Sequence, residues 1–268
     1  GSEMCIRDRK YRCKLKIPIS WYIFQGIGIF CVCLHGIIKE KGVRGAMKNQ
    51  TVDKLWNVMI CIGLGGLVVF FSAMFSMFLV IAQRNNDHSF TTIDSFALCL
   101  FCLFASFILL RLSQSLDLFF FDLKFLTKRN IQIILTATIS LLILSVLESV
   151  LIDHKVIIEK ALNPLDTQVL STVPLVIIVL FTFVLSPIME EVVFRGGIIG
   201  LVFKDHAFLG VWVSSILYSI LLKPETFICG LLYLLVNGIL GLAYVKTGRL
   251  IVPLLIKISA CLIVFFLI

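Results

Sequence analysis

Apolar residues form nine long runs along this chain, and short polar connectors separate them. A hydrocarbon core about 30 Å thick needs about 20 apolar residues in a helix that rises 1.5 Å per residue. Because the runs are continuous and do not alternate with polar residues, a membrane β-barrel is excluded. The pattern predicts helices over residues 17–38, 55–82, 93–112, 130–152, 169–189, 192–203, 206–222, 227–245 and 250–268.

These runs predict an all-α fold, a polytopic transmembrane helical bundle of about eight membrane helices. The stretch Leu112 to Phe125 is amphipathic, and we expect it to lie at the membrane interface. The composition excludes a soluble protein, since 59% of the 268 residues are hydrophobic and only 15% are charged. We expect a multi-pass protein of a cell membrane.

The charge pattern divides the chain and bears on its orientation. Residues 1–16 form a tag-like start and a basic cytoplasmic tail, 17–129 the N-terminal membrane helices, and 130–268 a membrane core. The net charge of +8 comes from Lys and Arg beside apolar segments, which indicates contact with anionic lipid and no nucleic-acid partner. Both ends of 17–38 are basic, so the sidedness of the amino terminus stays open.

One run carries three ionisable side chains. The stretch SPIMEEVVFRGGIIG, residues 186–200, places Glu191 and Arg195 four residues apart on one helix face, with Glu190 about 100° away. A charge at the bilayer centre costs at least about 2.5 kcal/mol, so these groups must face the bundle interior or a wet cavity. Ser186 and Pro187 are expected to begin a new helix after a break in the chain.

The stretch SPIMEEVVFRGGI resembles the first motif of the CPBP family, also called Abi or CAAX-protease-like, of intramembrane glutamic endopeptidases. The resemblance covers about residues 130 to 268, and it implies that Glu190 activates water while Glu191 and Arg195 support it. It also implies two further motifs with histidine and asparagine on later helices.

Both later motifs are degenerate in this chain. In WVSSILYSILL, Tyr218 stands in the aromatic position and Leu222 replaces the histidine of the second motif. In GRLIVPLLIKISACLIVFF, Lys257 replaces the histidine of the third motif and Cys261 replaces its asparagine. Loss of one donor to the developing oxyanion typically costs about 100-fold to 1000-fold in rate, so motif one alone predicts impaired catalysis.

The replacement at position 257 leads to a hypothesis about Glu190 and Glu191. Two carboxylates, Arg195 and Lys257 sum to zero formal charge, and an ammonium opposite the carboxylates lowers their basicity. We expect Lys257 to reach the Glu190/Glu191 pair and turn a water-activating site into a structural lock between two helices.

Three functions remain open on these residues. The first is a catalytically impaired scaffold or regulator that binds another membrane protein; the resemblance implies a bacterial plasma membrane and partners such as a cell-wall enzyme, a sensor kinase or an export system. The alternative is an active intramembrane glutamic endopeptidase that cleaves membrane-associated peptides with Glu190 as general base and Lys257 or Tyr218 as donor. A small-solute transporter is less favoured, because the first half lacks a second broken helix.

No cofactor and no metal are predicted. Cys99 and Cys102 have the spacing of a ligand pair, but no second pair completes a set, so we interpret them as packing residues. His206 begins a predicted helix and is a weak candidate for a catalytic substitute, and Asn237 is expected to form an interhelical hydrogen bond.

Overall fold

The computed structural model describes residues 50–85, 90–118, 126–154, 173–224 and 226–267. All its regular elements in these ranges are helices. In chain order they are α2 (Gln50–Asn85), α3 (Thr92–Ser115), α4 (Lys128–Asp153), α6 (Leu175–Leu180), the π-helix η3 (Phe181–Leu185), α7 (Ser186–Glu191), the π-helix η4 (Val192–Val202), α8 (Ala207–Leu221), α9 (Phe227–Thr247) and α10 (Ile251–Leu267).

Five described helical segments are long and apolar enough to cross a membrane. They are Asp53–Ile81, Thr92–Ser115, Lys128–Asp153, Leu175–Val202 and Phe227–Thr247; Ala207–Leu221 and Ile251–Phe266 are shorter apolar helices. The predicted all-α, polytopic membrane fold is therefore confirmed. The predicted span 17–38 lies outside the described residues.

The two predicted spans 169–189 and 192–203 are wrong as separate helices, because Leu175–Val202 is one uninterrupted helical segment. Leu185 and Ser186 both have right-handed helical backbone angles, and the backbone N–H of Ser186 donates to the carbonyl oxygen of Phe181 in the preceding turn. Pro187 lacks an amide donor and its ring crowds the preceding turn of a regular α-helix. The π-helical turn η3, directly before α7, provides the wider backbone that accommodates the proline inside a continuous helix.

The interfacial helix predicted for Leu112 to Phe125 is also wrong where the structure describes it. Residues 112–115 form the last turn of α3, and Asp117 turns the chain with a φ of 58°. Leu118 is then buried, with its Cδ1 3.2 Å from the position of a Cβ on Gly196. The described part thus contains the end of α3, a turn and a buried leucine in place of a separate amphipathic helix; residues 119–125 lie outside the described part.

Local sequence signals account for several helix ends. Thr91 forms a capping box with Asp94 at the start of α3. Thr127 caps α4 and Thr226 caps α9 through their side-chain oxygens. Gly248 ends α9 with a φ of 64°, a conformation that glycine adopts without steric cost.

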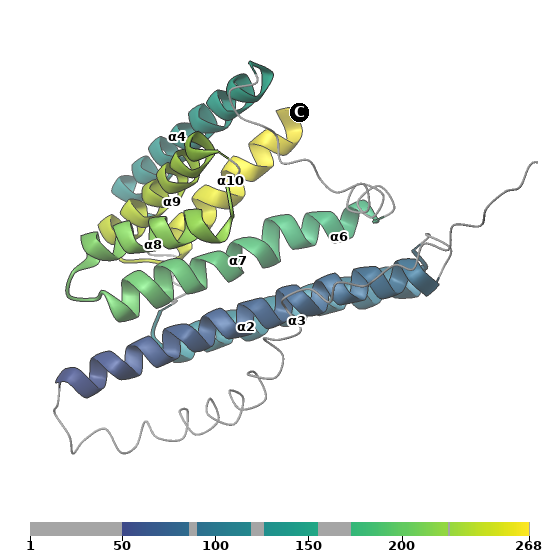
Figure 1. The fold of residues 1–268 in the computed structure, drawn as a ribbon, viewed down its shortest axis with the longest axis horizontal. Helices are drawn as coiled ribbons and strands as arrows, with labels where there is room; N and C mark the ends of the chain where they lie inside the picture. The colour runs from purple at the N-terminus through teal and green to yellow at the C-terminus, as the bar shows by residue number, and fades with distance from the viewer. Residues whose placement is uncertain (1–49, 86–89, 119–125, 155–172, 225, 268) are drawn as a thin grey trace, which may run out of the picture. The chain divides into compact units, whose positions relative to one another are not determined.

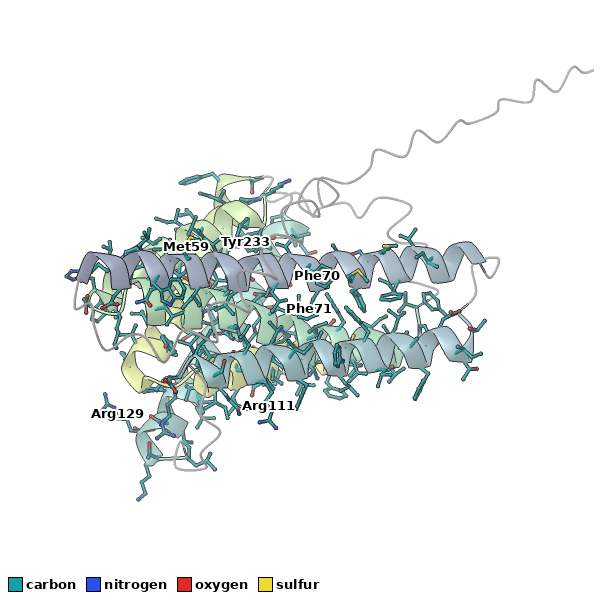
Figure 2. All side chains as sticks on the ribbon, turned by 90° about the horizontal axis from the view of Figure 1, so that it is seen from below. Met59, Phe70, Phe71, Arg111, Arg129 and Tyr233 are labelled. Carbon is teal, nitrogen blue, oxygen red and sulfur yellow. The ribbon has the colours of Figure 1, made fainter. Side chains whose placement is uncertain are left out.

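The helices pack in two connected groups (Figure 1). α2 and α3 lie against each other and against the segment from α6 to η4, while α8, α9, α10 and α4 pack on one another. Phe75 of α2 stacks on Phe181 of η3 at 4.2 Å between ring centroids. Figure 2 labels Phe71 on α2, whose ring meets Phe101 of α3 edge to face at 6.1 Å. The segment from α6 to η4 thus lies between the two groups and contacts both.

Glycines allow the closest helix approaches. A Cβ on Gly210 of α8 would lie 2.8 Å from Cβ of Phe203 and 3.3 Å from Cα of Ile199. A Cβ on Gly241 of α9 would lie 3.1 Å from a methyl carbon of Val211. Since lipid tails are as apolar as leucine, such backbone proximity and the packing it permits drive helix association in a membrane.

Candidate functional site

The two acidic residues lie at the end of α7, in the helix that contacts both groups. Glu190 and Glu191 are the last two residues of α7, between the π-helices η3 and η4. π-helical turns are rare and occur frequently at functional sites. The predicted constellation therefore lies at the most irregular part of the described membrane helices.

Glu191 and Arg195 form a fully buried ion pair. Arg195 Nη1 donates to Glu191 Oε1 at 2.9 Å, and the two side chains are 0% and 1% exposed, respectively. Arg195 Nη2 also donates to the carbonyl oxygen of Asn237 on α9, at 3.3 Å. The guanidinium therefore joins the central helix to α9. Removal of one partner would leave a buried charge uncompensated, which typically costs about 3 to 5 kcal/mol.

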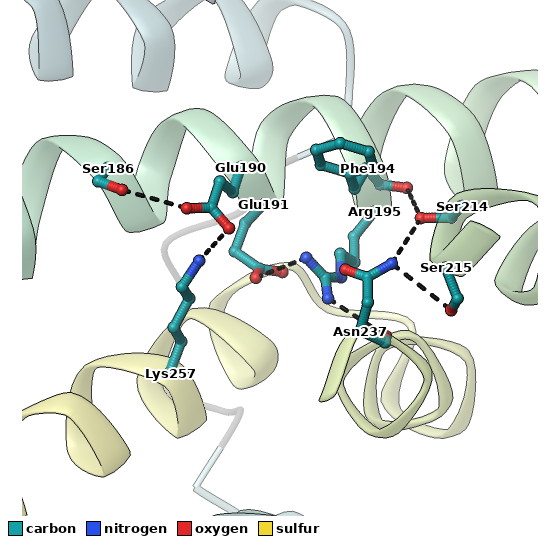
Figure 3. Close-up of polar contacts among 9 residues, drawn as sticks. All are labelled: Ser186, Glu190, Glu191, Phe194, Arg195, Ser214, Ser215, Asn237 and Lys257. Atoms are coloured by element: carbon teal, nitrogen blue, oxygen red, sulfur yellow. Dashed lines mark hydrogen bonds and ion pairs between the residues drawn. The ribbon is translucent and has the colours of Figure 1, made fainter. Parts of the chain in front are cut away.

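A second group of polar contacts continues from Asn237 to α8 (Figure 3). Asn237 Nδ2 donates to Ser214 Oγ at 3.3 Å and to Ser215 Oγ at 3.5 Å. Ser214 Oγ donates in turn to the carbonyl oxygen of Phe194, also at 3.3 Å. The interhelical hydrogen bond predicted for Asn237 is confirmed. The network ties η4, α8 and α9 together at the level of Arg195.

Glu190 makes a different set of contacts. Lys257 Nζ of α10 donates to Glu190 Oε2, and Ser186 Oγ donates to Glu190 Oε1 at 3.1 Å. Tyr218 of α8 also interacts with this carboxylate, and its ring centroid lies 6.0 Å from Lys257 Nζ. The side chains of Lys257 and Glu190 are 16% and 25% exposed, whereas Glu191 is buried. Glu190 is thus the carboxylate nearer the surface of the bundle.

The expected contact between Lys257 and the acidic pair is therefore present, and it is made to Glu190. Each oxygen of that carboxylate accepts a hydrogen bond from a protein side chain. A general base must be free to accept a proton from water, and an adjacent ammonium lowers its basicity. The contact joins α7 to α10.

The other predicted positions lie at varied distances from Glu190. Tyr218 packs edge to face on Phe194 at 5.1 Å, one turn before Leu222, which ends α8 and is 38% exposed. Cys261 lies one turn after Lys257 on α10. His206 is the residue before α8, twelve residues from Tyr218, which is about 18 Å along a helix. His206 is therefore not brought to the carboxylates.

A cleft of about 450 Å³ reaches Lys257. Side chains of α4, η3, α9 and α10 line it, including Glu148, Thr182 and Tyr233 as well as Lys257 and Cys261. Lys257 and Cys261, the two positions compared above with the third motif, thus face one cavity. The space is within the range of about 300 to 1000 Å³ that is typical of small-molecule sites.

Three polar residues of this region were not predicted. Ser214 and Ser215 occur as a pair in the apolar helix α8, and Ser214 precedes Tyr218 by four residues, so the helical repeat places them on one face. Glu148 is a lone carboxylate within the apolar run of α4. An acidic residue in a membrane segment is a signal that sequence reasoning can use.

The predicted packing role of two cysteines agrees with their surroundings. Cys102 is buried in the hydrophobic core, and Cys99 packs against that core; both thiols are free. Within the described ranges, no group of three or more His, Cys, Asp or Glu residues is arranged to hold a metal ion.

Residues 172–262 match the family model of the type II CAAX prenyl endopeptidase Rce1-like proteins. The match confirms the family resemblance predicted from SPIMEEVVFRGGI, and it lies inside the predicted core 130–268. Comparison with curated proteins and with solved structures found no match. The C-terminal part of this multi-pass membrane protein therefore has a CAAX-protease-type membrane fold.

Proposed function

We propose that this protein is a catalytically impaired CPBP-like scaffold or regulator, which binds another membrane protein and alters its stability, placement or activity. One observation carries the proposal: Lys257, at the position of a motif histidine, pairs with Glu190, the carboxylate that would activate water. In this proposal, Glu190 and the side chain at the position of the motif histidine form a contact between α7 and α10.

The polar network supports a static role for the surrounding residues. Arg195 is engaged by Glu191 and by the Asn237 carbonyl. Leu222 carries no hydrogen-bond donor on its side chain, so it cannot stabilise an oxyanion as a histidine does. These links join η4, α8 and α9, and we infer that the partner contacts the exposed apolar surface of the joined helices.

The test uses the tagged full chain in its native membranes. We expect one membrane protein to be recovered in stoichiometric amount, and its abundance or activity to change when the gene for this chain is deleted. The double variant Glu190→Gln/Lys257→Met, which removes both charges and keeps the side-chain volumes, should recover the same protein. Recovery of no stoichiometric partner by the unmodified chain would contradict the proposal.

The second candidate is an active intramembrane endopeptidase that cleaves membrane-associated peptides with Glu190 as base. The cleft favours it, because Lys257 lines the cleft, so a substrate there would contact the ammonium that pairs with Glu190. Purified protein in lipid nanodiscs should then cleave transmembrane peptides, with activity lost in Glu190→Gln and retained in the control Asp153→Asn, at the exposed end of α4. We expect no Glu190-dependent cleavage.

A further inference from the structure

The cleft described above is elongated and polar at both ends. α4 and α10 run in the same direction, with their C-terminal ends at one end of the bundle (Figure 1). The lining residues on α4 extend from Leu141 to Glu148, and those on α10 from Lys257 to Phe265. Seven residues of helix span about 10 Å. Lys257 therefore lies toward one end of the cleft and Glu148 toward the other, with apolar side chains between them.

Glu148 has no partner within the described part of the chain. It takes part in neither of the two ion pairs found there and makes no hydrogen bond, whereas Lys257 is engaged by Glu190. No charged side chain of the described residues acts on it. A lone carboxylate within a membrane-spanning helix is costly, and such a residue normally pairs with a cation or marks a binding site.

The position of Glu148 points to the membrane interface as the source of that cation. It lies five residues before Asp153, the last residue of α4, which is about 7.5 Å along the helix. Ser145, one turn earlier, and Tyr233 of α9 line the same cleft. A headgroup at the interface can therefore reach the carboxylate while its chain runs inward toward Lys257.

We propose that this cleft binds a phospholipid with a primary ammonium headgroup. The ammonium pairs with Glu148, and one acyl chain lies along the apolar side chains between Glu148 and Lys257. The inference is independent of whether the protein is a scaffold or a peptidase. The size of the cleft favours a single chain over a helix of a partner protein. A helix 10 Å in diameter and 10 Å long occupies about 800 Å³, more than the 450 Å³ present.

Headgroup chemistry, not the apolar chain, must supply the selectivity. An acyl chain gains little by moving from the bilayer into an equally apolar cleft. A primary ammonium donates charge-assisted hydrogen bonds to a carboxylate, whereas a trimethylammonium has no N–H to donate and a glycerol headgroup carries no cation. A hydrogen bond to a charged group corresponds to about tenfold or more in affinity.

The experiment is native mass spectrometry of the purified full chain, titrated with phosphatidylethanolamine, phosphatidylcholine and phosphatidylglycerol of identical acyl chains. We expect phosphatidylethanolamine to bind at least about tenfold more tightly than the other two lipids. In Glu148→Gln the preference should fall to within about twofold, because the isosteric amide keeps the shape and removes the charge. The control Asp153→Asn, outside the cleft on the same helix, should keep it.

A second variant tests the place of binding without changing a charge. Leu144→Trp, which fills the cleft between Leu141 and Glu148, should weaken retention of phosphatidylethanolamine in the presence of an intact carboxylate. Equal binding of the three lipids by the unmodified chain, or a preference that survives in Glu148→Gln, would overturn the proposal. If the chain shows no lipid preference but recovers a membrane protein only when Glu148 is intact, the cleft binds a basic side chain of that protein and the lipid proposal is wrong.

Discussion

Removal of the Lys257 ammonium is the sharpest test of the ion pair between α7 and α10. In Lys257→Met the carboxylate of Glu190 retains the Ser186 hydroxyl and loses its cation. Breaking a fully buried pair costs about 3 to 5 kcal/mol. Because the two side chains are 16% and 25% exposed, the pair is not fully enclosed by protein, and we expect a loss at or below the lower end of that range, about 2 to 3 kcal/mol.

That loss is measurable as a thermal shift. For a chain of this size, 1 kcal/mol changes the melting temperature by about 2 to 4 °C, so Lys257→Met should unfold roughly 5 to 10 °C below the unmodified protein in the same detergent. The double variant Glu190→Gln/Lys257→Met should return to within about 1 kcal/mol of it, since replacement of both members of a buried pair is often neutral.

The control is another lysine of the same bundle. Lys246 is exposed near the end of α9, and Lys246→Met should change the stability by no more than about 0.5 kcal/mol. The reasoning fails if the melting temperatures of Lys257→Met and the unmodified protein agree within error, or if the double variant is no more stable than Lys257→Met. In either case the ion pair does not stabilise the packing of α10 on α7.

Three further substitutions probe the remaining contacts by the same unfolding measurement. Arg195→Lys should destabilise the protein by at least about 2 kcal/mol, because an ammonium cannot replace a guanidinium that donates to Glu191 and to the Asn237 carbonyl from two nitrogens. Stability equal to that of the unmodified chain would refute this. Gly210→Ala should cost about 1 to 3 kcal/mol through overpacking, whereas Gly66→Ala, where a Cβ meets nothing within 4 Å, should be neutral or stabilising; equal effects would contradict the close approach. Ser214→Ala should cost about 1 kcal/mol by removing an acceptor of Asn237, and no loss would discount that bond.

The wrong predictions of a helix start at Ser186 and of a separate amphipathic helix after Leu112 have the same physical cause. Ser186 and Pro187 have the composition of a helix start, but local propensity cannot reveal that a π-helical turn just upstream accommodates the ring. The stretch from Leu112 to Phe125 looks amphipathic by periodicity, yet the chain turns at Asp117 and buries Leu118 near Gly196. In both places tertiary packing overrides a weak local preference.

The amino-acid sequence by itself determined the class of the protein and the location of its unusual charges. Runs of about 20 apolar residues have one stable form in a bilayer, the helix, because backbone groups have no water to bond. Glu190, Glu191, Arg195 and the lysine at position 257 were identifiable because ionisable side chains are rare and costly in such runs.

Only the tertiary structure decided which of these charges meet. It assigned Lys257 to Glu190, and among the described residues it gave Glu148, at the end of a cleft, no partner; the pair of Glu191 and Arg195 already follows from their four-residue spacing on one helix. Residues 67 positions apart come together through the packing of α10 beside α7, and no spacing within either helix encodes that register. The pairing is a property of interhelical geometry, which arises from small-residue contacts and side-chain fit along the whole bundle.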